Sequence, residues 1–124
     1  MAVSYRIDED LVEIVVVGEV TVDDVIGQIH ASVQDPDLRP PTHLLLNVTE
    51  SELLPHKEDV PRLAAALAAV QHQMGGRIAV LVAHPVRFGL ARQISAFLRG
   101  DGVQLMPFLE REQACLWLQG HEES

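Results

Sequence analysis

The chain has 124 residues, a size typical of one domain, and 48% of them are apolar although only five are aromatic. A net charge of −9 argues against nucleic acid as a partner, because binding to phosphates requires a basic face. The sequence has no apolar run near the ~18–20 residues of a membrane span, no secretory signal and no second cysteine beside Cys115. We therefore expect a cytoplasmic protein without disulfides.

Two short apolar runs open the chain, at residues 3–7 and 12–18. The charged residues 8–10 separate them, so we expect an antiparallel hairpin whose first strand lies at the edge of a sheet. Thr21 follows as a good N-cap, because its hydroxyl can accept a hydrogen bond from an unpaired amide. Helical spacing of apolar side chains predicts the first helix from residue 22 to about 34.

The middle of the chain alternates between strand and helix. Residues 43–48 form a short apolar run typical of a strand, and the acidic residues 49–59 predict an irregular loop. Pro61 suits the first turn of a second helix, and the glycine pair at 75–76 suits its end.

Residues 78–83 are apolar without alternation, which is typical of a strand whose two faces are both buried by helices. We therefore expect a strand over 77–83 to be central in the sheet. A helix over 86–99, a strand over 103–108 and a short closing helix over 110–118 complete the pattern.

The order of elements, ββαβαβαβα, predicts a single α/β domain over residues 1–120. Its sheet is expected to be mixed, mostly parallel and five-stranded, with about four helices. Residues 121–124 are expected to form a disordered tail.

This pattern resembles the STAS fold of anti-sigma-factor antagonists and, more closely, the SpoIIAA-like (STAS/SEC14-like) branch of small bacterial proteins. The residues that carry the resemblance are 18–21 (GEVT), 44–48 (LLLNV), 76–83 (GRIAVLVA), 88–92 (FGLAR), Phe108, Glu112, Ala114, Trp117 and Leu118. The resemblance implies a regulatory or protein-interaction domain, or a domain that binds an apolar, lipid-like ligand.

One stretch departs from the phosphorylated members of that fold. Those proteins resemble one another at an Asp-Ser-Ser-Gly-type stretch after the third strand, where this chain has Asn-Val-Thr-Glu-Ser-Glu at 47–52. A phosphate on Thr49 or Ser51 would sit among like charges, which is unfavourable unless a helix terminus or an arginine offsets them. We therefore expect a domain without the usual phosphoserine switch, with Thr49 and Ser51 as the residues to test.

Polar side chains follow the parallel strands at their carboxyl ends, where open α/β sheets tend to bind ligands. The candidate ligand-binding residues are Asn47 and Thr49 after the third strand and His84 and Arg87 after the fourth. The alternative is that these residues only cap and terminate their elements.

No pattern in the sequence supports catalysis or a cofactor. The six histidines have no metal-binding spacing, and Cys115 has no histidine near it in sequence to act as a base. Carboxylate pairs, nucleophile–base pairs and cofactor fingerprints are also missing, so we expect neither an enzyme nor a metal or other cofactor.

Charge is distributed unevenly along the chain. Residues 1–59 carry 3 basic and 13 acidic side chains, whereas the helix over 86–99 carries three arginines and no acid. Its apolar side chains exceed what a sheet can cover, which favours an interface with a protein partner or a second copy of the chain, as in a homodimer. The candidate interface residues are Phe88, Leu90, Arg92, Phe97 and Arg99. The competing hypothesis is a carrier or sensor for a small apolar molecule held between sheet and helices.

Overall fold

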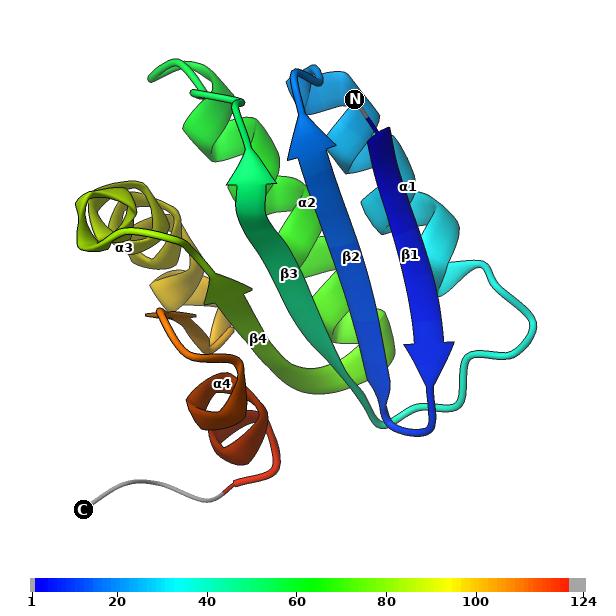
Figure 1. The fold of residues 1–124 in the computed structure, drawn as a ribbon. Coiled ribbons are helices and arrows are strands. Elements are labelled where there is room, and N and C mark those ends of the chain that lie inside the picture. Colours follow the sequence, from blue (N-terminus) through cyan, green and yellow to red (C-terminus); the bar gives the residue numbers. More distant parts are fainter. Residues whose placement is uncertain (1, 121–124) are drawn as a thin grey trace.

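The computed structural model describes residues 2–120, in which five strands form one sheet in the order β1-β2-β3-β4-β5 (Figure 1). The strands are β1 (Ala2–Asp8), β2 (Leu11–Gly18), β3 (Thr42–Ser51), β4 (Gly75–Leu81) and β5 (Leu105–Phe108). β1 pairs antiparallel with β2, and all other neighbours are parallel. The predicted mixed, mostly parallel sheet with an edge hairpin is confirmed.

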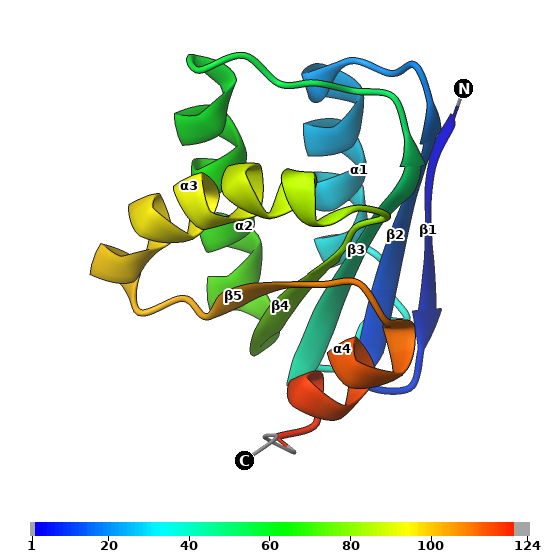
Figure 2. The ribbon, with the colours of Figure 1, turned by 60° about the vertical axis from the view of Figure 1, so that its left-hand side comes forward.

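Four α-helices cover the two faces of this sheet unequally. They are α1 (Val22–Val33), α2 (Asp59–Met74), α3 (Phe88–Leu98) and α4 (Arg111–Leu118). Figure 2 shows α1, α2 and α3 on one side of the sheet and α4 on the other. Each parallel crossover moves one strand further along the sheet in the same direction, and because such crossovers are right-handed as a rule, successive crossover helices fall on the same face.

The prediction for residues 77–83 was right about the burial of 78–82 and wrong about the position of the strand in the sheet. Residues 78–82 are buried, with α2 and α3 over one face of the segment and α4 over the other. The centre of the sheet is β3, however, while β4 lies beside the short edge strand β5. Ala83 is exposed, because the strand has already ended at Leu81.

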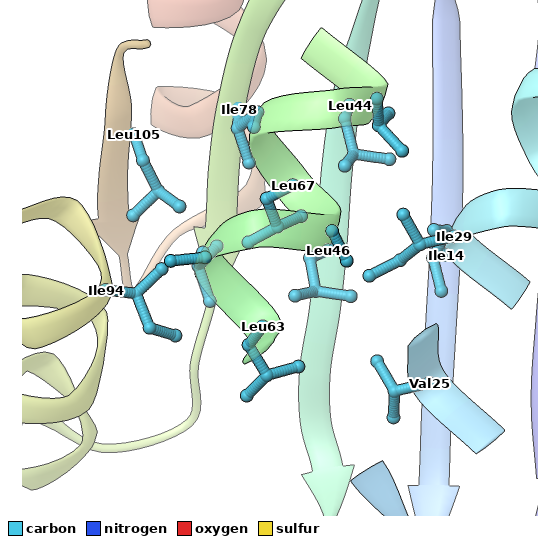
Figure 3. Close-up of a cluster of buried hydrophobic side chains, with 14 of the residues drawn as sticks. Ile14, Val25, Ile29, Leu44, Leu46, Leu63, Leu67, Ile78, Ile94 and Leu105 are labelled. Carbon is cyan, nitrogen blue, oxygen red and sulfur yellow. The ribbon is translucent and has the colours of Figure 1, made fainter. Parts of the chain in front are cut away.

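The main core lies between the sheet and the three crossover helices. Figure 3 shows side chains of β2, β3 and β4 meeting those of the helices, among them Ile14, Ile29, Leu44, Leu67 and Ile78, all at most 1% exposed. Burying such a side chain contributes roughly 1.5–3 kcal/mol to folding. The aliphatic composition therefore accounts for the core without aromatic residues.

Two predicted ends of helices are confirmed. The Thr21 hydroxyl accepts the amide of Asp24 at 3.0 Å, and the Asp24 carboxylate accepts the amide of Thr21, which completes a capping box. Gly75 ends α2 in the left-handed conformation, with φ of 78°.

Two other boundaries differ from the predictions. β3 continues to Ser51, because Glu50 and Ser51 pair with the end of β2 although they are acidic or polar. The helix expected over 86–99 is divided into a 3-10 turn, η1 (Pro85–Arg87), then α3, then a second turn over 99–101. The predicted disordered tail at 121–124 lies outside the described residues.

Candidate functional site

A surface groove runs between the segment that follows β3 and the start of α3. Leu54, Pro55 and Lys57 line one side, and Val86, Leu90 and Gln93 line the other. Its volume is 480 Å³. Leu54 is 70% exposed and Val86 is 82% exposed, so two large apolar side chains face solvent in one place. We call this surface the α3 groove.

A smaller apolar pocket adjoins the α3 groove. It has a volume of 70 Å³ and lies between the carboxyl half of the sheet, α2 and α3. Its walls are aliphatic, with Leu46, Leu67, Val80 and Ile94 among them. Pro55, Arg87 and Leu90 line both the pocket and the groove, so the two spaces meet at these residues.

Arg87 lies at the mouth of the pocket, where the pocket meets the groove. Its Nη1 donates to the carbonyl oxygen of Leu53 at 3.0 Å, and its Nη2 donates to the carbonyl oxygen of Ser51 at 3.5 Å. These bonds tie the segment after β3 to η1. Within residues 2–120, no carboxylate forms an ion pair with Arg87.

The five interface candidates, four on α3 and Arg99 directly after it, divide into three environments. Phe88 and Leu90 are partly buried against the main core, and the guanidinium of Arg92 lies 5.9 Å from the centre of the Phe88 ring. Arg92 and Arg99 are exposed. Phe97 is 56% exposed, lies on the same side of the helix as Leu90 two turns earlier, and does not line the α3 groove.

The opposite face of the sheet carries a buried carboxylate. Glu13 in β2 is only 4% exposed. Arg111 donates to its two oxygens at 3.0 and 2.5 Å, Arg6 donates at 3.1 Å and the amide of Asn47 donates at 3.2 Å. The Arg111 hydrogen bonds are the largest influence on the pKa of Glu13, and with Asn47 and Arg6 they lower it although burial raises it.

The structure does not gather the four predicted ligand-binding residues. Asn47 and Thr49 are joined, because the Asn47 side-chain oxygen accepts both the amide and the hydroxyl of Thr49, at 3.1 and 2.8 Å. Arg87 binds the Ser51–Leu53 backbone instead, and His84 is exposed at the start of η1. Asn47 thus belongs to the Glu13 cluster and Arg87 to the α3 groove.

The two hydroxyls considered for phosphorylation are engaged locally. The Ser51 hydroxyl accepts the amide of Leu53 at 3.1 Å, and Ser51 also lines the apolar pocket. Phosphorylation of Thr49 or Ser51 stays a prediction.

Metal ligands and membrane spans can be described for residues 2–120. No three His, Cys, Asp or Glu side chains of this region are placed to hold a metal ion together. None of its helices has the length and apolar character needed to cross a membrane. Cys115 is half-buried on α4.

Sequence reasoning missed the Glu13 cluster and the exposed pair Leu54 and Val86. A signal for Glu13 exists, since it is the one charged residue within the apolar run 11–18. A buried strand position with a charge requires a partner, and that partner, Arg111, lies 98 positions away.

The architecture defines the class of this protein as an α/β domain with a SpoIIAA-like fold. It is similar to the crystal structure of an uncharacterized protein from the DUF3478 family with a SpoIIAA-like fold from Shewanella loihica PV-4, with a TM-score of 0.61. The two chains are 17% identical, and the match covers 94% of this chain and 92% of the other. The predicted resemblance is therefore confirmed for the fold. No protein-family model matches the sequence, and no curated protein matches it.

Proposed function

We propose that this protein is a non-catalytic interaction domain that binds a segment of a partner protein in the α3 groove. The observation that carries the proposal is the exposure of Leu54 and Val86 in one groove. Exposed apolar side chains that adjoin one another are typical of interaction sites, because a partner removes them from water. Lys57 and Gln93, which line the groove, supply the polar rim that such surfaces have.

The arrangement of polar groups supports a role without catalysis. Glu13 already accepts hydrogen bonds from three side chains, so its charge is compensated within the protein. Asn47 donates to this same compensated carboxylate, Thr49 binds the Asn47 side chain, and Arg87 binds backbone carbonyls, so none of the three is paired with a free base.

A second candidate function is the binding of a small apolar molecule, which the pocket beneath Arg87 favours. Its 70 Å³ is below the ~150 Å³ of a cavity that accepts benzene. A lipid chain would therefore require the pocket to widen, and for this reason we prefer the interaction domain.

The test uses peptides displayed on phage and selected against the immobilised protein. Selected peptides are then titrated against the wild type, Val86→Glu in the groove and Met106→Glu as the matched control. Met106 is also an exposed apolar residue, 43% exposed, but it lies on β5 outside the groove. We expect Val86→Glu to weaken binding about tenfold or more and Met106→Glu to leave it unchanged.

Equal binding by all three proteins would contradict the proposal. Sedimentation of the same proteins distinguishes a foreign partner from a second copy. A dimer that Val86→Glu dissociates would make the groove the site of self-association.

A further inference from the structure

We propose that the partner segment inserts one small aliphatic side chain into the pocket beneath Arg87 and places a neighbouring carboxylate on the Arg87 guanidinium. This inference rests on the proposed function and specifies the chemistry of the partner. It follows from the size of the pocket, from its walls and from the charges around its mouth.

The pocket has the size of one side-chain end. Its 70 Å³ is about half the ~150 Å³ of a cavity that accepts benzene. That space suits the branched end of a valine, leucine or isoleucine rather than an aromatic ring or an extended chain. Interfaces commonly depend on a few anchors of this kind, each filling a preformed pocket.

The walls of the pocket select an apolar group. Leu46, Leu67 and Val80 are at most 7% exposed and offer no hydrogen-bonding side chains. Ser51 and Arg87 are the only residues with polar side chains in the lining. A polar group inserted past them would lose its hydrogen bonds to water without replacement, which is unfavourable.

The mouth of the pocket selects a negative charge. Arg87 has five N–H donors, and the hydrogen bonds found for it use backbone carbonyls, one of them at 3.5 Å. Lys57 lines the groove beside it, and neither the groove nor the pocket is lined by an acid. A carboxylate would form a charge-assisted hydrogen bond with Arg87, which is stronger than a bond to a neutral carbonyl.

Arg87 borders both spaces, so the two features of the ligand are adjacent. A segment lying along Leu54 and Val86 would direct its aliphatic side chain inward past Arg87, while an acidic residue next to it remains at the mouth. The predicted recognition element is therefore an aliphatic residue beside Asp or Glu.

The experiment is a double-mutant cycle between protein and peptide. The strongest peptide from the selection is synthesised in three forms: unchanged, with its acid replaced by the neutral amide, and with its aliphatic residue replaced by alanine. Each is titrated against the wild type, Arg87→Gln and Arg92→Gln. Arg92 is the matched control, an exposed arginine of α3 that does not line the groove.

We expect the alanine form to bind about tenfold or more weakly to every protein. Loss of the peptide's acid should weaken binding to the wild type and to Arg92→Gln but have little effect on binding to Arg87→Gln, because the partner of the acid is already absent there. Thermal melting shows whether Arg87→Gln remains folded.

Three results would overturn the inference. One is a peptide acid whose removal has the same effect with and without Arg87. Another is a set of groove-binding peptides without an aliphatic residue beside an acid, which leaves the proposed function standing. The third is octanoate competing for the pocket with an affinity equal to that of the peptide, which would assign the pocket to a small amphiphile.

Discussion

The guanidinium of Arg111 binds both carboxylate oxygens of Glu13, at 3.0 and 2.5 Å, although 98 positions separate the two residues. This pair joins the start of α4 to the first half of β2. At the other end of α4, Arg77 of β4 donates to the carbonyl oxygen of Trp117 at 2.7 Å and lies 5.0 Å from the centre of its ring. The helix on the second face is therefore fixed at both ends around a small apolar cluster that includes Ala114.

Removing Arg111 should destabilise the fold. Arg111→Ala leaves a buried carboxylate with two fewer charge-assisted hydrogen bonds, so we expect a loss of about 1.5–2 kcal/mol in the free energy of unfolding. Urea denaturation measures this value. The control is Arg6→Ala, which removes an arginine with a 73% exposed side chain from the same carboxylate and should lower stability by less than about 1 kcal/mol. Equal losses would show that Arg111 has no special role.

The Glu13 cluster also predicts the response to acid. The Arg111 hydrogen bonds hold the pKa of Glu13 below its ordinary 4.5, so the unfolded chain takes up the proton first as the pH falls. The stabilisation is fully present above about pH 4.5 and is lost as the pH falls from there through the folded pKa. Urea titrations of the wild type and Glu13→Gln between pH 7 and pH 3 should give a difference in stability that shrinks below pH 4.5. A constant difference would contradict the prediction.

Two glycines should respond to alanine in opposite directions. A Cβ on Gly76 would lie 2.3 Å from the carbonyl oxygen of Thr42 and 2.7 Å from Nδ1 of His43, so Gly76→Ala should lower stability by about 3 kcal/mol or more. Gly27 in α1 has nothing within 4 Å of such a Cβ, so Gly27→Ala should raise stability by about 0.5–1 kcal/mol. Thermal melting of the two variants checks both signs. Equal shifts would mean that the contact at Gly76 does not decide the outcome.

Much of the fold could be predicted because its determinants are local. The Thr21 cap, the left-handed Gly75 and the apolar run at 78–82 are each defined by neighbours in sequence. The position of β4 in the sheet is not local, since it depends on the direction in which every crossover moves. Uniform burial of a strand indicates that both of its faces are covered, but it does not determine which position the strand takes in the sheet.

The candidate sites were harder to predict, because they form between distant segments. In the sequence, Leu54 looks like part of an acidic loop. It becomes one wall of a groove only because η1, which contains Val86, folds beside it. Asn47 was placed with His84 on the expectation that strand ends converge. It instead points to the face that carries Glu13, because its position in β3 is paired with Val15, two residues from Glu13 along β2.

His43 should make the stability of the protein depend on pH near neutrality. Its Nδ1 accepts the amide of Arg77 at 3.0 Å, where β4 has an extra residue opposite β3. Burial lowers the pKa of His43 below its ordinary 6.5. Asp10 opposes this shift and Arg77 reinforces it. Because the unfolded chain binds the proton first, stability should be full above about pH 6.5 and should decline as the pH falls from there through the folded pKa.

Urea titrations between pH 8 and pH 5 measure this decline. His43→Gln removes the titrating group, so its stability should fall less steeply below pH 6.5 than that of the wild type, whatever its starting value. His72→Gln, at an exposed position of α2, is the matched control and should keep the wild-type dependence. Parallel curves for His43→Gln and the wild type would show that the imidazole is not held neutral by its bond to Arg77.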